Sequence, residues 1–544
     1  MAPPWSLIAV SAAVLVVSLK PEYSIRQSYF CTAVSFVAVT VFCQFVYRSI
    51  LYPDFLSPLR HIPTPKDRSW FKGNSRSIFL EVPADHARRW TKEIPNNGLI
   101  RYYMAGNVER VMVIGPKALS EVLVSKVYDF PKSESLRIKL LRFTGNGLLL
   151  AEGDEHKAQR KGLMPSFAYR HIKDLYPTFW TKSVEMVDTI EKQLSSSSSK
   201  DNVIQVSNWA GRVTLDIIGL AGMGRDFGTI QDPDNTFRQQ YEKLRFVPTT
   251  FAKWLVLIST LTVGFKRLFQ LPTKWNRASI EAAEYIREVA REIVQEKKEK
   301  LKRGDLQGVD IASIALTSGV FSDENLVDQM ITFLVAGHET IATSLQWAVY
   351  ALCNHPEIQA RLREEIRSHL PATIRSKDDG KKPQPATAAQ VDSLPYLNAF
   401  CNEVLRFYPP VRSTGREARK DTSILGHYIP KGTLLLLVPG ATNLDTELWG
   451  PDAEEFNPDR WIGEGRAKSG GANTNYAFLT FLHGPRSCIG QSFAKSELAC
   501  LVAVLVGRFR MELQDPMKKL ETTNSVTTAP KDGVMARFTR LEGW

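Results

Sequence analysis

The stretch "FLHGPRSCIG", residues 481 to 490, constrains the fold of this chain more than any other segment. Cys488 follows Arg486 by two residues, and Gly484 and Gly490 flank it. Glycine lets backbone pass close to a bulky group or adopt a positive φ. A nearby guanidinium, backbone N–H groups and the start of a following helix lower the pKa of a thiol. The surroundings of Cys488 therefore favour a thiolate, the form that binds metals.

The other cysteines offer no competing metal site. The six cysteines of the chain contain no C-x-x-C pair and no tight cluster, so their spacing predicts neither a zinc site nor a disulfide framework, and a reducing compartment fits best. A lone protein thiolate without further protein ligands points to haem, because the porphyrin supplies four other ligands to the iron. The alternative is a buried cysteine in a glycine-rich turn.

The stretch resembles a known motif. Phe481, Gly484, Arg486, Cys488 and Gly490 match every position of F-x-x-G-x-R-x-C-x-G, the haem-binding loop of the cytochrome P-450 family. The resemblance implies that the cofactor is haem b, iron protoporphyrin IX, and that Cys488 is its axial thiolate and the metal ligand. It also implies that Arg486 pairs with a haem propionate.

A second motif lies within the helix-like run from Ser322 to Asn354. In "AGHET", glycine and threonine weaken a helix interior, and the Thr340 hydroxyl can bond to the Ala336 carbonyl, which predicts a local bulge. The segment resembles the family's A/G-G-x-D/E-T motif above the distal haem face. The resemblance implies that Ala336 lines the haem pocket, that Thr340 hydrogen-bonds to dioxygen above the haem, and that Glu339 helps to relay protons. Ile341 stands where the family often has Thr or Ser.

A third motif is structural. Glu403 and Arg406 lie at i and i+3 on one helical face, where a solvated surface pair would be the ordinary interpretation. The spacing resembles the family's E-x-x-R, which an arginine from an F-x-P-x-R segment completes. Here "FNPDRW" supplies Arg460. The resemblance therefore implies a partly buried network of Glu403, Arg406 and Arg460 that fixes the cysteine loop.

Two more arginines are candidate partners of the haem propionates. Arg416 lies where the family often has a basic residue, and Arg160 ends "HKAQR" where W-x-x-x-R is usual. His156 replaces that tryptophan and can still donate a hydrogen bond to a propionate. Lys157 and Lys161 belong to a segment that faces an acidic reductase in the family, although a solvated helix face explains them equally well.

The N-terminal part of the chain predicts a membrane anchor. Tyr29 to Tyr47 is a run of nineteen residues without a formal charge, about the length that crosses a hydrocarbon core. An earlier apolar run, Trp5 to Leu19, is shorter and fits a second span, an interfacial helix or the apolar region of a signal peptide. Basic residues after the longer span place the rest of the chain in the cytosol by the positive-inside rule. These residues are Arg48, Arg60, Lys66 and Arg68.

Periodicity and prolines predict the organisation of the chain. Residues 1–56 form the anchor, the proline-containing stretch 57–66 is a linker, and 67–544 form one catalytic domain. Helical spacing of apolar residues is clearest over 278–302, 322–354 and 491–508, whereas "RVMVIG" (110–115) and "TLLLLVPG" (433–440) are typical of strands. The predicted fold class is mainly α with small β-sheets, which is the cytochrome P-450 fold preceded by a transmembrane helix.

The glycine-rich stretch "GMGRDFG" (222–228) is not a dinucleotide-binding loop. It lacks the third glycine in position, and no strand is evident before it. No flavin or nicotinamide domain is therefore predicted, and electrons must come from another protein. The resemblance implies NADPH-cytochrome P-450 reductase as the donor, with cytochrome b5 as a candidate second donor. The net charge of +12 suits an anionic membrane or an acidic partner, and no nucleic-acid motif accompanies it.

The implied function is that of a microsomal haem-thiolate monooxygenase in the endoplasmic reticulum membrane. It would activate O2 with electrons from NADPH and oxidise an apolar small molecule, and resemblance to fungal members favours biosynthesis of a secondary metabolite. Family position suggests that Ala336, Val411, Thr414 and parts of 135–147 line the substrate pocket. Two alternatives remain. One is a haem-thiolate isomerase or dehydratase, and the other is a haem-binding protein without turnover.

Overall fold

The computed structural model describes residues 5–19, 22, 28–196, 202–244, 274–306, 308–373, 384–523 and 526–544. These residues are mainly helical and include three small sheets, so the predicted fold class is confirmed. The helices of the anchor and of the first half of the body are α1 Trp5–Leu19, α2 Tyr29–Val46, α3 Ser75–Leu80, α4 Asp85–Glu93, α5 Pro116–Ser120, α6 Glu134–Thr144, α7 Gly153–Leu163, α8 Tyr169–Ile172, α9 Tyr176–Ser196, α10 Val206–Ile217 and α11 Thr236–Lys243.

The second half of the body is also dominated by helices. They are α14 Lys274–Lys302, α15 Ile311–Thr317, α16 Asp323–Asn354, α17 Pro356–His369, α18 Ala388–Asp392, α19 Pro395–Phe407, α20 Pro439–Thr442, α21 Thr446–Trp449, α22 Arg466–Ser469 and α23 Gln491–Arg508. The three helical runs predicted from apolar spacing correspond to α14, α16 and α23.

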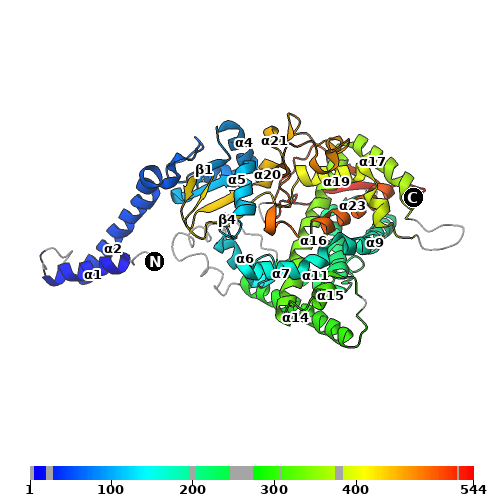
Figure 1. The fold of residues 1–544 in the computed structure, drawn as a ribbon, viewed down its shortest axis with the longest axis horizontal. Helices are drawn as coiled ribbons and strands as arrows, with labels where there is room; N and C mark the ends of the chain where they lie inside the picture. The colour runs from blue at the N-terminus through cyan, green and yellow to red at the C-terminus, as the bar shows by residue number, and fades with distance from the viewer. Residues whose placement is uncertain are drawn as a thin grey trace.

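The N-terminal segment with α1 and α2, the candidate membrane anchor, projects from one end of the body (Figure 1). Helix α2 continues beyond Val46 as a π-helix, η3 Tyr47–Leu56, so the helical segment is longer than the predicted span. Tyr29–Leu56 is long and apolar enough to cross a membrane by length and composition. Pro53 lies inside η3, between the end of the predicted span and the predicted linker 57–66. A contact from Asn107 Nδ2 to the Ser49 carbonyl, 2.6 Å long, ties η3 to the body.

Two long helices form the centre of the body. The side chain of Ser322 caps α16 by accepting a hydrogen bond from Asn325 N. Most of the thirty-two residues of α16 are buried, and α16 packs against α10, α14 and α23. Because α16 and α23 pack against each other in one hydrophobic core, the loop that precedes α23 is held close to α16. That position is where the predicted cysteine and threonine should meet.

A four-stranded sheet covers the end of the body nearest the anchor (Figure 1). Its order is β1-β2-β7-β4, and the two strands predicted from sequence, β2 and β7, lie side by side in parallel with Val111 opposite Leu435. The strands are β1 Leu99–Tyr103, β2 Glu109–Val113, β7 Leu434–Leu437 and β4 Thr414–Glu417. Strand β4 carries Arg416 from this sheet toward the centre of the molecule.

Two smaller sheets complete the described fold. One has the order β3-β9-β8, and the other is the pair β5-β6. Their strands are β3 Val203–Gln205, β8 Phe509–Leu513, β9 Met535–Arg540, β5 Thr422–Ile424 and β6 His427–Ile429.

Candidate active site

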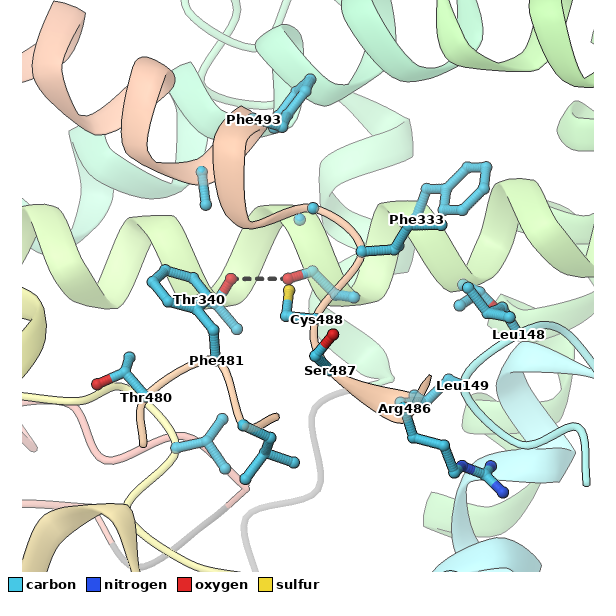
Figure 2. Close-up of a pocket in the computed structure, with 18 of the residues that line it drawn as sticks. Leu148, Leu149, Phe333, Thr340, Thr480, Phe481, Arg486, Ser487, Cys488 and Phe493 are labelled. Atoms are coloured by element: carbon cyan, nitrogen blue, oxygen red, sulfur yellow. Dashed lines mark hydrogen bonds between the residues drawn. The ribbon is translucent and has the colours of Figure 1, made fainter. Parts of the chain in front are cut away.

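A deep cavity of about 330 Å³ lies between α16 and the loop that precedes α23. Figure 2 shows this loop with Phe481, Ser487 and Cys488, and behind it the helix that carries Thr340. Most of the residues singled out by sequence line the cavity. They are His156, Arg160, Ala336, Thr340, Val411, Thr414, Arg416, Phe481, Arg486, Cys488 and Gly490.

The backbone of the cysteine loop is held from both sides. Cys488 N donates to the Phe481 carbonyl at 2.8 Å and closes the turn. Gly484 does not line the cavity but makes the turn possible, because its φ is +75° and a Cβ there would lie 2.1 Å from the Leu123 carbonyl oxygen. Only glycine fits at that position. The loop therefore presents Cys488 from a backbone that cannot easily shift.

The Cys488 side chain is accessible from the cavity, yet the surrounding protein removes it from bulk water. Burial raises the pKa of the thiol, although the Gly490 N–H and the charge of Arg160 act in the opposite direction. A backbone N–H group and a guanidinium therefore act in the predicted direction, but desolvation outweighs them. A thiolate at this position therefore needs a further positive centre.

Positive charge gathers along one side of the cavity. Lys132, Arg416 and Arg486 all line it, and Glu152 is the carboxylate beside them. Arg486 NH1 pairs with Glu152, and its NH2 donates to the Ala151 carbonyl at 2.7 Å. Burial and the neighbouring guanidiniums lower the pKa of Arg416 to about 10 and that of Lys132 well below its ordinary value. Such a cluster favours binding of an anion.

His156 and Arg160 reach the same cavity from α7. Arg160 NH1 donates to the Ser487 carbonyl at 2.8 Å, so this guanidinium supports the cysteine loop directly. His156 Nδ1 lies 3.1 Å from the Tyr128 hydroxyl, and burial together with Arg486 and Arg160 lowers the pKa of His156 to about 3. The imidazole is therefore neutral at physiological pH.

In the α16 motif, Thr340 faces the cavity and Glu339 faces the surrounding protein. Thr340 lines the cavity, and its hydroxyl donates to the Ala336 carbonyl at 2.7 Å. Glu339 turns away and accepts a hydrogen bond of 2.7 Å from the Thr527 hydroxyl. The predicted bulge was wrong, since α16 is a continuous α-helix from Asp323 to Asn354. The threonine back-bond is accommodated because close packing holds the helix along most of its length.

Some of the residues predicted to line the substrate pocket line the cavity, and others do not. Ala336, Val411 and Thr414 line the cavity. Among the described side chains of 136–147 none lines it, and Leu148 and Leu149 do so instead. Helix α6 occupies most of that segment and packs against α14 and α16, which places the first cavity residues just after the helix ends.

The predicted structural network is assembled and is more deeply buried than expected. Arg406 NH2 donates to Glu403 Oε1 at 2.7 Å, and Arg460 Nε donates to the same oxygen at 3.2 Å. Trp461 Nε1 donates to the other carboxylate oxygen at 2.9 Å. The side chains of Glu403 and Arg406 are 0% exposed. Arg406 also donates to the carbonyl of Asn443, whose side chain receives the Leu479 N–H, so the network reaches the start of the cysteine loop.

Sequence reasoning missed much of the cavity wall, and Lys132 and Ile218 are two examples. Lys132 follows Pro131 in an irregular segment, and no motif or spacing singles it out. Ile218 directly follows α10 as the first residue of η9 Ile218–Met223, where burial alone explains an isoleucine. A map of contacts between distant parts of the chain would be needed to find either residue.

The chemistry of the cavity fits haem. One sulfur ligand faces the space, and apolar side chains such as Leu405, Phe481 and Phe493 provide walls for a flat ring. The cluster of buried cations, opposed by Glu152, suits the two carboxylates of the porphyrin. A bound ferric ion would supply the positive centre that a buried Cys488 thiolate requires.

Comparison with known proteins points the same way. The family model for cytochrome P-450 matches residues 73–536. Cytochrome P-450 monooxygenase sphH of Aspergillus fumigatus is 50% identical over 530 residues, covering 97% of both chains. Cytochrome P-450 monooxygenase FSL4 of Gibberella zeae is 42% identical over 523 residues, covering 92% of both chains. The cysteine loop, the cavity and these matches together show that the chain belongs to the cytochrome P-450 family of oxidoreductases.

Proposed function

We propose that this protein is a haem-thiolate monooxygenase that inserts one oxygen atom of O2 into an apolar small molecule. The observation that carries the proposal is the position of Cys488, whose sulfur opens onto a mostly apolar cavity with a cluster of buried cations on one side. When bound, haem supplies the reductive activation of dioxygen. The protein supplies the ligand, the binding of the cofactor and the delivery of protons.

Each group at the cavity has a role in this proposal. Cys488 would hold the haem iron through its sulfur, and Gly490 N–H and Arg160 would stabilise the thiolate charge. Arg416, Arg486 and Lys132 would bind the propionates, and neutral His156 would donate a hydrogen bond to one of them. Removing one of these cations leaves a buried carboxylate without its counter-charge, which weakens binding of the cofactor.

Proton delivery is assigned to α16. The Thr340 hydroxyl lines the cavity, and its oxygen can accept or pass on a proton once its bond to the Ala336 carbonyl opens. Glu339 faces Thr527, so it serves as the outer member of the relay rather than as a group in contact with substrate. The Thr340 hydroxyl favours a monooxygenase over an isomerase or dehydratase, because those reactions rearrange a peroxide without needing protons from solvent.

The proposal extends to partners and location. The catalytic domain follows the linker 57–66 and runs to residue 544, and the helix Tyr29–Leu56 anchors it in the endoplasmic reticulum membrane facing the cytosol. Electrons come from NADPH through cytochrome P-450 reductase, with cytochrome b5 as a second donor. Arg160 contacts the cysteine loop from α7, so the exposed Lys157 on the same helix offers a basic contact near the haem. The oxidation of the substrate is a step in the biosynthesis of a secondary metabolite.

The test is NADPH-dependent oxygen consumption in microsomes that contain the full chain and a reductase, with a panel of terpenoid, polyketide and alkaloid scaffolds. The proposal expects reductase-dependent uptake of O2 and a product heavier than its substrate by one oxygen atom. Turnover without NADPH would instead indicate an isomerase, if the product has unchanged mass, or a dehydratase, if the product is lighter by one water. A haem-binding protein without turnover would consume no oxygen with any scaffold.

A further inference from the structure

The glycine-rich segment that is excluded as a dinucleotide loop has a different role in the structure. At the end of α10 the chain forms a π-helix, η9 Ile218–Met223, which is followed by Gly224. π-helical turns are rare and occur frequently at functional sites. Ile218, the first residue of η9, lines the cavity together with Ala336, Gly337 and Thr340, although it is only 3% exposed. The segment therefore delivers one apolar side chain to the wall of the cavity.

Ile218 packs against the point on α16 where a side chain is missing. A Cβ atom built on Gly337 would lie 2.8 Å from Ile218 Cδ1, closer than real contacts allow. Gly337 follows Ala336 and precedes Thr340 by one helical turn. The isoleucine therefore occupies space that any other residue at 337 would fill, next to the threonine assigned to oxygen chemistry.

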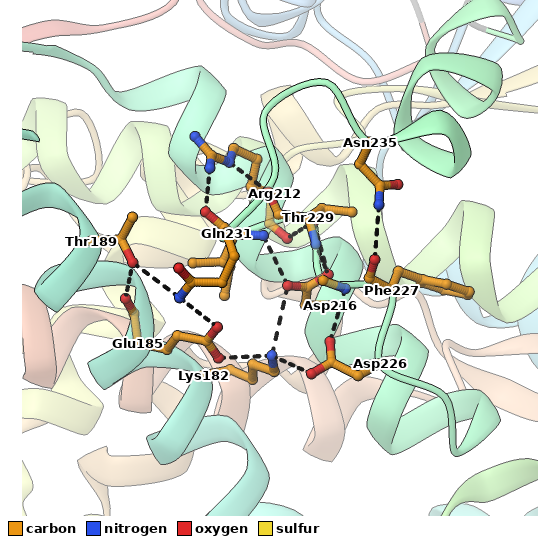
Figure 3. Close-up of polar contacts among 12 residues, drawn as sticks. Lys182, Glu185, Thr189, Arg212, Asp216, Asp226, Phe227, Thr229, Gln231 and Asn235 are labelled. Atoms are coloured by element: carbon orange, nitrogen blue, oxygen red, sulfur yellow. Dashed lines mark hydrogen bonds and ion pairs between the residues drawn. The ribbon is translucent and has the colours of Figure 1, made fainter.

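The segments around η9 hold this wall in place through polar contacts, several of them buried (Figure 3). Lys182 on α9 is 4% exposed, and its ammonium pairs with Asp226 at 2.6 Å and with Asp216 at 3.7 Å. Asp216 is 0% exposed and lies on α10 two residues before Ile218, whereas Asp226 follows η9. One lysine therefore ties together the two ends of the π-helix.

A second set of bonds fixes the loop after η9 to α10. Asp216 accepts hydrogen bonds from Thr229 N at 2.7 Å and from Ile230 N at 3.0 Å. Arg212, one turn earlier on α10, donates to the Thr229 carbonyl at 2.7 Å. Because these groups are buried and bonded to one another, the backbone that carries Ile218 is a rigid part of the wall.

We propose that Ile218 is a specificity-determining residue that limits the size of the apolar group a substrate can place beside Thr340. The inference rests on the proposed function and deepens it. Ile218, Ala336 and Gly337 present hydrocarbon here, so the part of the substrate that faces this stretch of α16 is hydrocarbon. A larger or smaller side chain at position 218 changes which ligands fit without touching the cysteine loop.

The test measures the affinity for a graded set of imidazoles that carry methyl, phenyl or naphthyl groups. Binding of each compound is monitored by the optical shift of the haem. It uses the full-length protein in lipid nanodiscs. For Ile218→Ala we expect the affinity for the naphthyl compound, relative to the methyl compound, to rise about tenfold over the wild-type ratio. For Ile218→Phe we expect the same ratio to fall about tenfold.

Ile217→Ala is the matched control, because Ile217, the last residue of α10 and the neighbour of Ile218, is 0% exposed but does not line the cavity. It should keep the wild-type ratio. If Ile218→Ala does not fold, Ile218→Val should show a smaller change in the same direction. If the Ile218 variants kept the wild-type ratio of naphthyl to methyl affinity, the inference would be overturned and the proposed function would stand. A wild-type protein without any optical response to imidazoles would overturn the proposed function and the inference with it.

Discussion

His86 shows how burial changes the charge of a single side chain in this protein. It lies on α4, is 6% exposed and packs edge-on against Trp90 with the rings 5.0 Å apart. Desolvation lowers the pKa of His86 to about 4, with Glu81 opposing and Arg89 adding to the shift. The folded protein therefore keeps this imidazole neutral at any pH above about 4.

His86 makes the stability of the protein fall in mild acid. The unfolded chain binds a proton at His86 below about pH 6.5, whereas the folded chain does not. The free energy of unfolding should therefore decrease as the pH falls from about 6.5 to about 4, by up to about 3 kcal/mol from this residue. Denaturant titrations of wild type and His86→Gln across this range measure the effect. An equally steep pH dependence in the variant would contradict it.

Single residues were predictable from the sequence where a rigid motif fixes their spacing. The positions of Cys488, Phe481 and Arg486 depend on one short loop, so ten residues of sequence suffice to bring them together. Lys132 and Ile218 reach the cavity through tertiary packing between distant segments, which no local pattern records. The direction of the Cys488 pKa was also beyond prediction, because desolvation depends on everything that encloses the thiol.

At the scale of elements, the cysteine loop depends on backbone that only glycine allows. Gly484 and Gly426 both have positive φ, +75° and +80°, but only Gly484 has backbone within reach of an added Cβ. Gly484→Ala should therefore be severely destabilising and should prevent haem incorporation. Gly426→Ala should cost only backbone strain, on the order of 1 kcal/mol. Haem content per purified protein compares the two, and equal losses would contradict this explanation.

The buried network of Glu403, Arg406 and Arg460 predicts a second difference, between the effects of a buried and an exposed substitution on stability. Glu403→Ala leaves Arg406 and Arg460 without their shared carboxylate, so the free energy of unfolding should fall by about 3 to 5 kcal/mol. Glu521→Ala breaks an ion pair whose partners are 60% and 72% exposed, and should cost at most about 1 kcal/mol. Denaturant unfolding of both variants measures the difference. Similar small losses in the two variants would show that the network is not structural.

Elements were predicted well where the apolar period is long and regular. Helices α14, α16 and α23 and strands β2 and β7 follow the sequence pattern closely. The bulge in α16 was wrongly predicted, and the π-helices η3 and η9 were not predicted at all. Glycine, threonine and proline weaken a regular helix, but the packing of neighbouring helices decides which turn becomes irregular.

At the scale of the whole molecule, the candidate anchor and the body differ in the surroundings that their surfaces suit. The helix Tyr29–Leu56 leaves most of its apolar side chains exposed, which suits the bilayer location that we propose for it. Val37→Arg places a charge near the middle of the predicted span, which costs about 2.5 to 3.5 kcal/mol on insertion. We expect more of this variant than of wild type to be released by alkaline carbonate extraction of membranes. Val82→Arg, on the surface of the body, should stay bound like wild type, and equal release of the two variants would contradict a spanning anchor.

The central claim is that Cys488 is the thiolate ligand of a haem in the cavity between α16 and the loop before α23. The most direct measurement is the difference spectrum of the reduced, carbon-monoxide-treated full-length protein, for wild type and for Cys488→Ser. The wild type should show the long-wavelength absorption band that a thiolate ligand produces, and Cys488→Ser should lack it. The same band in both proteins would contradict the account.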